Sequence, residues 1–278
     1  QGLGVAEVAL WARGVDSSRF DPGHRSEAWR RSVAPNGEKI IGFVGRLAAE
    51  KQVEDLAALT DLPGAKVVIV GDGPWRTRLQ RLLPEAHFTG FLGGDALAQA
   101  VASFDLMVAP GELETFCQTI QEAMASGVPV VATGRGGPLD LVDQSRNGWL
   151  YRPGDLGQLE HHVRDLVGDD AKRAAFARAA RATVESRTWA AIGDQLLAHY
   201  AEAEARGEPF QMEGNSDSAH RERIGNAVPP AAAEAIAHVM GTTLLLAAAG
   251  ETFMLSNMPV WVRPVAVGLS MAEREVKA

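Results

Sequence analysis

The sequence predicts an α/β fold: a Rossmann-like, doubly wound parallel sheet followed by a mainly helical or irregular C-terminal tail. Two observations support this prediction. From about residue 38, short runs rich in valine and isoleucine alternate with amphipathic segments of about 10 to 15 residues, which is the pattern of βαβ units. Right-handed crossovers then place helices on both faces of the sheet. Beyond residue 207 the alternation stops, and the chain becomes polar and rich in turn residues.

The expected strands are short apolar runs, most of them followed by glycine or proline. They lie at residues 38–46, 65–73, 86–91, 105–110, 128–134 and 147–155. The segments between them have apolar residues at helical spacing, and one of them begins with Pro74, which favours a first helical turn. The expected helical segments lie at residues 50–62, 74–84, 94–104, 115–127, 137–144, 154–167, 170–184 and 188–206.

The fold class predicts where a ligand would bind. In a doubly wound sheet, ligands bind outside the carboxyl ends of the strands. Four glycine-containing turns follow expected strands, at residues 45–46, 71–74, 110–111 and 134–137. We therefore expect the functional residues to lie at this edge of the sheet.

The composition argues against several classes of function. The formal net charge is −8 at pH 7, whereas sequence-independent binding of nucleic acid needs a basic face. The longest apolar run of the tail, residues 244–249, is far shorter than the ~20 residues that span a bilayer. Cys117 is the one cysteine of the chain, which rules out an intramolecular disulfide and fits a reducing, cytoplasmic location.

Two glutamates, Glu114 and Glu122, flank the start of the expected helix at 115–127. Thr115 is the predicted N-cap, and Glu122 lies about two turns further, ~12 Å along the axis at ~1.5 Å per residue. The two carboxylates cannot share a proton, but they can contact two ends of one elongated ligand. The free N–H groups near Phe116 and Cys117 would then face a phosphate. The spacing equally allows two solvated helix charges.

Two cations, Arg46 and Lys51, follow the first expected strand. Together they could neutralise a diphosphate leaving group at the carboxyl edge of the sheet. The alternative is ordinary surface charge, with Lys51 pairing with Glu54 or Asp55 on its own helix. The two residues taken alone favour this alternative.

Several separate blocks of the sequence resemble one family. They are WARGVDSSRFDP (11–22), VGRLAAEK (44–51), VVIVGDGP (67–74), the long block 88–133 and GWLYRPGD (148–155). Together they resemble the donor-binding half of retaining glycosyltransferases of the GT-B fold, the family with the E-x7-E motif that acts on nucleotide-activated sugars. The resemblance covers residues 1–205. FTGFLGG (88–94) and ETFCQTIQEAMASG (114–127) are most similar to actinobacterial mannosyltransferases that use GDP-mannose to build lipid-linked glycans.

The resemblance implies roles for individual residues. Arg46 and Lys51 would hold the donor diphosphate and stabilise its charge as the sugar leaves. Glu114 would contact the sugar, so these three are the candidate catalytic residues. The other candidate donor contacts are Gly45, the Thr115, Phe116 and Cys117 backbone at the sugar and phosphate, Glu122 at the ribose hydroxyls, and Phe91 and Leu92 beside the base. The family often needs no metal, the chain has no Asp-x-Asp motif, and we expect neither a metal nor a cofactor.

The resemblance also implies a domain organisation. A GT-B enzyme has two Rossmann-like domains with the reaction in the cleft between them, and this chain begins just before the segment that joins them. We expect an interdomain segment at 1–37, a nucleotide-sugar-binding domain at 38–207, and an acceptor-binding domain missing from a chain that is inactive alone. The expected partners are the nucleotide-sugar donor and, for the full enzyme, a lipid or glycan acceptor, but no nucleic acid. Association with the inner face of a membrane is expected only through the missing domain.

The tail, residues 208–278, resembles a different family. Residues 210–240 are similar to the C-terminal end of cytosine-5 DNA methyltransferases, whose IGNAVPP motif stands at 224–230. The cysteine nucleophile of that family follows a proline, whereas Cys117 stands in Phe-Cys-Gln. Two alternatives to a glycosyltransferase half therefore remain: a DNA-interaction module related to such methyltransferases, or a non-functional fusion joined near residue 207.

Overall fold

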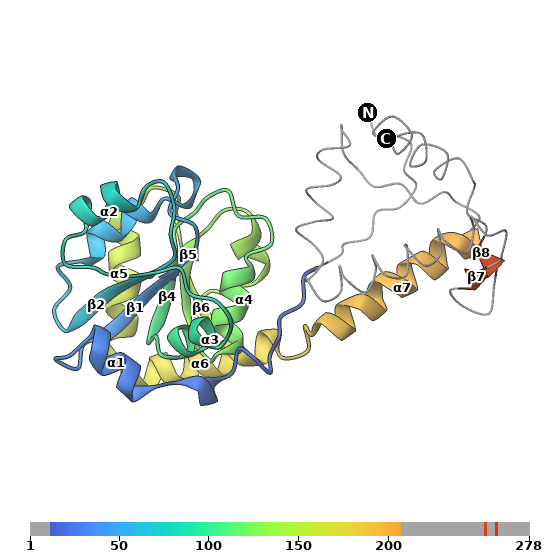
Figure 1. The fold of residues 1–278 in the computed structure, drawn as a ribbon, viewed down its shortest axis with the longest axis horizontal. Helices are drawn as coiled ribbons and strands as arrows, with labels where there is room; N and C mark the ends of the chain where they lie inside the picture. Colours follow the sequence, from blue (N-terminus) through green and yellow to red (C-terminus); the bar gives the residue numbers. More distant parts are fainter. Residues whose placement is uncertain (1–11, 207–252, 255–258, 261–278) are drawn as a thin grey trace, which may run out of the picture. The chain divides into compact units, whose positions relative to one another are not determined.

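A computed structural model describes residues 12–206, 253–254 and 259–260 of the chain (Figure 1). The chain divides into two compact units, Gln1–Glu208 and Pro209–Ala278. In the second unit the described residues are two short antiparallel strands, β7 (Phe253–Met254) and β8 (Pro259–Val260). The methyltransferase-like segment at 210–240 lies outside the described residues. The division into segments at 1–37, 38–207 and 208–278 stays a prediction.

The first unit contains a six-stranded, fully parallel sheet, which confirms the predicted α/β doubly wound class. The strands are β1 (Lys39–Val44), β2 (Ala65–Val70), β3 (His87–Gly90), β4 (Leu106–Ala109), β5 (Val130–Thr133) and β6 (Gly148–Tyr151). Their order in the sheet is β3-β2-β1-β4-β5-β6. Each strand lies within a segment that the sequence predicts to be extended.

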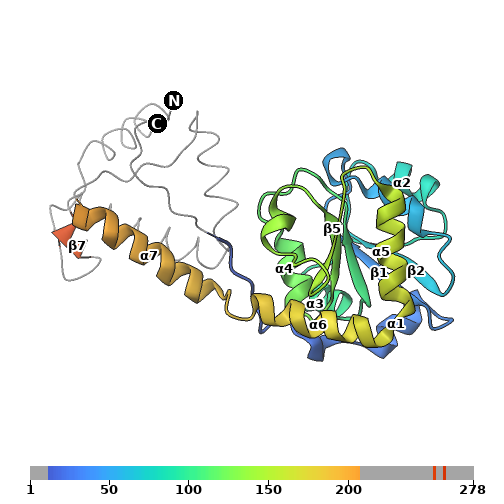
Figure 2. The same cartoon turned by 180° about the vertical axis from the view of Figure 1, so that it is seen from behind.

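Helices cover both faces of the sheet (Figures 1 and 2). The helices of this part are α1 (Glu27–Val33), α2 (Arg76–Leu82), α3 (Gly94–Ala102), α4 (Gln118–Ala125), α5 (Leu156–Gly168) and α6 (Asp170–Val184), with short 3₁₀ helices at Pro22–His24, Ala49–Lys51, Val53–Leu59 and Gly137–Asp140. The last helix, α7 (Trp189–Arg206), extends away from the sheet (Figure 1). None of the helices in the described parts of the chain combines the length and the apolar composition needed to cross a bilayer.

Two buried apolar clusters, one on each face, hold the helices to the sheet. Successive strand residues alternate between them, as the pleat requires: Ile40 belongs to the cluster with residues of α1, α3 and α4, whereas Ile41 belongs to the cluster with residues of α2 and α5. The helix α6 contributes to both clusters, since Ala180 belongs to the first and Phe176 to the second. The two cores therefore hold the strand ends in place. The loops that follow these ends lie outside the cores, where a ligand can reach them.

The segment at 50–62 differs from the single amphipathic helix predicted for it. Two short 3₁₀ helices replace it, because Gln52 adopts a left-handed conformation with φ 48° between them. The Gln52 side chain exchanges two hydrogen bonds with Glu112: its Nε2 donates to Glu112 Oε1 (3.2 Å), and its Oε1 accepts from the Glu112 N–H (2.8 Å). This contact with a neighbouring loop outweighs the helical periodicity.

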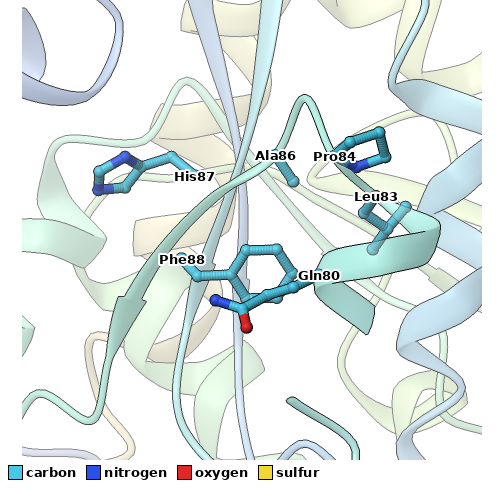
Figure 3. A pocket seen from close by; sticks show the side chains of 6 residues that line it. All are labelled: Gln80, Leu83, Pro84, Ala86, His87 and Phe88. Carbon is cyan, nitrogen blue, oxygen red and sulfur yellow. The ribbon is translucent and has the colours of Figure 1, made fainter. Parts of the chain in front are cut away.

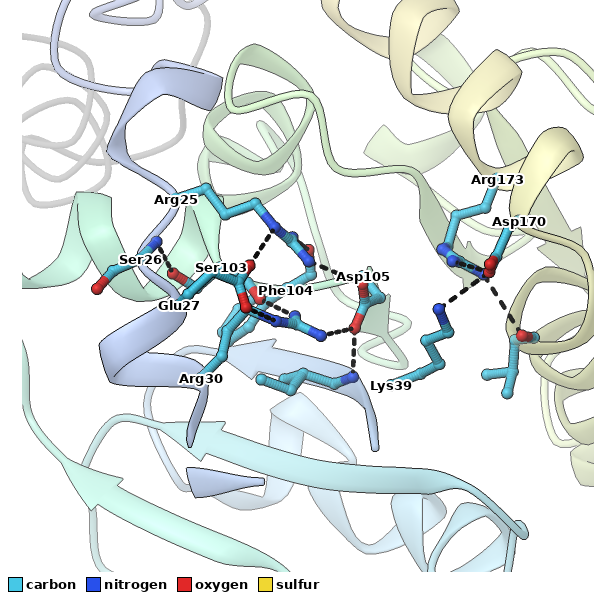
Figure 4. Close-up of polar contacts among 12 residues, drawn as sticks. Arg25, Ser26, Glu27, Arg30, Lys39, Ser103, Phe104, Asp105, Asp170 and Arg173 are labelled. Atoms are coloured by element: carbon cyan, nitrogen blue, oxygen red, sulfur yellow. Dashed lines mark hydrogen bonds and ion pairs between the residues drawn. The ribbon is translucent and has the colours of Figure 1, made fainter. Parts of the chain in front are cut away.

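At the amino edge of the sheet, the buried carboxylate of Asp105 joins α1 to two strands (Figure 4). Its Oδ2 accepts hydrogen bonds from the Ile40 N–H (2.7 Å) and Arg30 Nη2 (2.9 Å), and its Oδ1 accepts one from Arg25 Nη2 (3.1 Å). The two guanidinium groups also donate to the carbonyls of Ser103 and Phe104. The Asp105 carboxylate is thus paired with two cations within the fold.

Candidate ligand-binding site

The strand order creates a crevice between β1 and β4. The chain proceeds from β1 outward to β3 and then returns to β4 on the other side of β1. Ligands of doubly wound sheets bind at such a reversal, outside the carboxyl ends of the two central strands. Gly45 and Arg46 follow β1 there, and Pro110 and Gly111 follow β4. Two of the four turns expected from the sequence therefore lie at the reversal itself.

Glycines let the loops at this edge pack against one another. Gly71, after β2, has φ +143°, and a Cβ there would lie 1.9 Å from the Gly45 carbonyl oxygen. A Cβ on Gly73 would lie 2.4 Å from the carbonyl oxygen of Leu47. Larger residues at these positions would collide with backbone, so the glycines hold the loop after β1 against the loop after β2.

Lys51 and Glu114 form the central contact of the crevice. Lys51 Nζ lies 2.5 Å from Glu114 Oε1, although the two residues are 63 positions apart. Both side chains are largely covered, with exposed fractions of 28% and 22%. Lys51 therefore pairs across the reversal and not with Glu54 or Asp55, as the surface-charge alternative required. Arg46 stays at the exposed rim, where it pairs with Glu50.

The loop between β4 and α4 presents free N–H groups to the crevice. The helix α4 begins at Gln118, after Cys117 in a left-handed conformation with φ 51°, so the prediction of Thr115 as N-cap is wrong. The physical reason is a contact from the neighbouring turn, since the Gly137 N–H donates to the Glu114 carbonyl (2.7 Å). The N–H groups of Thr115, Phe116 and Cys117 have no hydrogen-bond acceptor among the described residues.

The turn after β5 packs against the loop between β4 and α4. Gly136 has φ +68°, and a Cβ there would lie 2.6 Å from the Glu114 carbonyl oxygen. A Cβ on Gly137 would lie 2.6 Å from the Thr115 carbonyl oxygen and 2.8 Å from Cys117 Sγ. Only glycine permits so close an approach, and this contact fixes the position of the loop relative to the sheet.

Gly137→Ala is expected to lower the free energy of unfolding by about 1–3 kcal/mol, because the added methyl group must displace the loop at Thr115 and Cys117. Urea denaturation monitored by circular dichroism measures the change. Gly168→Ala is the matched control, since a Cβ there meets nothing within 4 Å. It should change stability by less than about 1 kcal/mol. Equal stabilities for the two variants would contradict the close approach.

Two further candidate residues are influenced by burial. Glu122 lies half-buried on the second turn of α4, and burial raises the pKa of its carboxyl to about 7, opposed by a hydrogen bond from Gln118 and the charge of Arg19. Burial also raises the pKa of the Cys117 thiol to about 12. The thiol is therefore protonated at neutral pH and unsuited to act as a nucleophile.

Phe91 and Leu92 follow β3, the outermost strand on this side, two positions from β1. The side chain of Phe91 is 79% exposed, while Leu92 packs against the core. They share the carboxyl edge with Lys51 and Glu114 but lie toward its end. An exposed aromatic ring in this place can stack on a planar ligand group.

A hydrogen-bonded chain across three loops escaped the sequence analysis. Glu112 joins Gln52, after β1, to Arg135, after β5, since Arg135 Nη1 lies 2.7 Å from Glu112 Oε2. The partners are far apart in sequence and belong to no motif. The one sequence signal was the position of Glu112, two residues before Glu114.

A hollow of about 250 Å³ lies elsewhere, at the opposite edge of the sheet where β3 begins (Figure 3). It is lined by Gln80, Leu83, Pro84, Ala86, His87 and Phe88. None of the candidate residues from the sequence lines it. In the described part of the chain, no group of three or more His, Cys, Asp or Glu side chains is arranged to hold a metal ion.

Comparison with protein families and curated proteins supplies independent findings. The sequence model of the family described as "Glycosyl transferases group 1" matches residues 25–183. The GDP-mannose-dependent alpha-mannosyltransferase of Corynebacterium glutamicum is 50% identical over 200 residues, which cover 72% of this chain and 48% of that protein. The protein of the same name from Mycobacterium tuberculosis is 47% identical, over 73% of this chain and 53% of its own length. The chain spans about half the length of these curated relatives.

Solved structures share the fold. Anabaena HepE, crystallised with UDP-glucose, superposes with a TM-score of 0.62 at 26% identity, over 68% of this chain and 56% of that one. The C-terminal domain of a glycosyl transferase group 1 family protein from Francisella tularensis superposes with a TM-score of 0.54 at 22% identity. That comparison covers 63% of this chain and 98% of the Francisella domain.

Proposed function

Because the chain belongs to the glycosyl transferases group 1 family, we propose that its carboxyl sheet edge binds the nucleotide-sugar donor of a hexosyltransferase, and that the donor is GDP-mannose. The observation that carries this proposal is the contact between Lys51 and Glu114 at the strand-order reversal. Beside it lie three N–H groups that have no acceptor within the described part of the chain. A cation and free N–H groups suit a diphosphate, and a carboxylate suits sugar hydroxyls. The relatives named for GDP-mannose support the choice of donor.

In this proposal each residue at the edge contacts a different group of the donor. Lys51 and the exposed Arg46 neutralise the diphosphate, whose negative charge grows as the sugar leaves. Glu114 accepts hydrogen bonds from sugar hydroxyls, and the N–H groups of Thr115 to Cys117 donate to the sugar and the phosphate. Gly45 contributes its backbone after β1 to the phosphate, and a Cβ there would lie 3.1 Å from the Phe43 ring.

The ribose and the base of the donor contact residues on different sides of the loop between β4 and α4. Glu122 accepts hydrogen bonds from the ribose hydroxyls, while Phe91 and Leu92 flank the base. In the whole enzyme, we propose, a lipid or glycan acceptor receives the hexose, at the cytoplasmic side of the membrane. Positioning of that acceptor supplies a large part of the rate of such reactions.

Titration calorimetry with the full chain tests the donor proposal. GDP-mannose and GDP are expected to bind saturably, and UDP-glucose and UDP about tenfold more weakly or worse. Lys51→Met is expected to lower the affinity for GDP by about 10- to 150-fold, the contribution of a charge-assisted hydrogen bond. Lys172→Met is the matched control, because Lys172 forms an ion pair of the same 2.5 Å length with Asp165, away from the crevice. A folded sample that binds none of the four nucleotides would contradict the proposal.

A further inference from the structure

Residues 12–16 are held firmly between two parts of the fold. The Val15 N–H donates to the Arg187 carbonyl (2.8 Å), and Val15 pairs with Thr188 just before α7. A Cβ on Gly14 would lie 2.7 Å from the backbone of Trp189, so this position accepts only glycine. On the other side, the Gly14 carbonyl accepts a hydrogen bond from Gln118 Nε2 (3.2 Å), on the first residue of α4.

This arrangement brings Arg13 to the loop that carries Glu114. The Arg13 guanidinium lies over the Phe116 ring, 4.8 Å from its centroid. Among the described residues Arg13 has no ion-pair partner, and its buried Nε has no hydrogen-bond partner. Burial lowers the pKa of the guanidinium. A cation that is partly removed from water and lacks a carboxylate interacts strongly with an aromatic face.

Phe116 is less anchored than Glu114 and Cys117 in this loop. Glu114 is held by Lys51 and Gly137, and Cys117 is buried beside Gly137. The Phe116 ring is 37% exposed, and its carbonyl accepts one long hydrogen bond, from Gln121 Nε2 (3.4 Å). Among the contacts of the Phe116 side chain with the described residues, the stacking of Arg13 is the one that can restrain the ring.

We infer that Arg13 is a positioning residue, which stacks on Phe116 and holds the Glu114–Cys117 loop in the conformation that binds the donor. This inference rests on the proposed function, because the loop is the donor site of that proposal. It also links the segment at 12–16 and the start of α7 to the site through one side chain. Neither Arg13 nor its stacking contact is needed to explain the fold of the sheet.

A double-mutant cycle tests the contact through binding. Arg13→Met and Phe116→Leu are each expected to lower the affinity for GDP-mannose by about three- to thirtyfold. The affinity of the double variant should lie within about twofold of that of the single variant that binds more weakly. Arg13→Lys keeps a cation over the ring and should recover most of the loss. Arg78→Met is the matched control, because Arg78 stacks on Trp75 at 4.3 Å outside the site.

Reaction of the one cysteine with a thiol reagent tests the loop without any ligand. Cys117 is buried, so its rate of labelling by dithionitrobenzoate under native conditions reports how often the loop opens. Arg13→Met and Phe116→Leu are expected to speed labelling by about the same three- to thirtyfold, and Arg78→Met to leave it unchanged.

Nucleotide binding and cysteine labelling together distinguish a failure of the proposed function from a failure of the inference about Arg13. Wild-type chain that binds no nucleotide would overturn the proposed function. Unchanged labelling in both loop variants would overturn the inference about Arg13, whatever the wild type binds. Faster labelling with wild-type affinity would also overturn it, because the conformation of the loop would then not matter for the donor.

Discussion

Asp105→Ala is expected to lower the free energy of unfolding by about 3–5 kcal/mol. The carboxylate side chain is only 6% exposed and accepts hydrogen bonds from the Ile40 N–H, Arg25 and Arg30. Its removal leaves the Arg30 guanidinium, 12% exposed, with the exposed Glu27 carboxylate, 3.7 Å away, as its only counter-charge among the described residues. It also leaves the buried Ile40 N–H without its acceptor. Domains are typically stable by about 5–15 kcal/mol, so the loss is a large fraction of the total.

Urea denaturation of the full chain measures this loss, and two variants sharpen its meaning. Asp105→Asn keeps an acceptor for Ile40 but removes the charge, so its stability should be intermediate. Asp143→Ala removes an exposed ion pair with Arg146 and should change stability by less than about 1 kcal/mol. A stability of Asp105→Ala within that margin of the wild type would show that the network contributes little.

The Asp105 variants also separate stability from binding. Asp105 precedes β4, whereas the candidate site follows it, so the two lie at opposite edges of the sheet. Below its melting temperature, Asp105→Ala should bind GDP as the wild type does. At the amino edge Asp105 is paired with Arg25 and Arg30, while at the carboxyl edge N–H groups before α4 have no acceptor among the described residues. This difference supports the proposal that the second edge binds the ligand.

The sheet and the placement of the candidate residues at its carboxyl edge could be predicted from the sequence, because both depend on local patterns. Valine-rich runs such as 65–70 have to be buried on two faces, and glycines such as Gly71 mark the turn that follows. The E-x7-E spacing placed Glu114 before α4 and Glu122 within it, as the structure has them. These features need no knowledge of distant contacts.

What could not be predicted depends on partners far away in the chain. The left-handed Gln52 follows from a contact with Glu112, 60 residues later, and the late start of α4 from a bond to Gly137. The Asp105 network joins residues 65 to 80 positions apart. Local propensity favours a helix at 50–62 and a cap at Thr115, and tertiary contacts override it in both places.

Glu122→Ala is expected to weaken the binding of GDP by about 1.5–3 kcal/mol, the worth of hydrogen bonds from ribose hydroxyls to a charged acceptor. The pKa of Glu122, raised to about 7 by burial, adds a test of the charged form. Because the carboxylate is the better acceptor, the affinity of the wild type should rise from pH 6 to pH 8. Glu122→Gln should bind weakly and show no such rise. Calorimetric titrations at several pH values measure both effects.

The same residue should affect stability in the opposite direction, which excludes misfolding as the cause of weak binding. The folded chain holds the Glu122 proton up to about pH 7, whereas the unfolded chain loses it near 4.5. Between these values the folded state binds more protons, so this group makes stability fall as pH rises. Glu122→Gln removes the buried charge and should therefore be more stable than the wild type at pH 8, although it binds GDP less well. Glu160→Gln, an exposed pair with Arg164 on α5, should change neither quantity. If Glu122→Gln binds GDP as tightly as the wild type at pH 8, Glu122 does not contact the ribose.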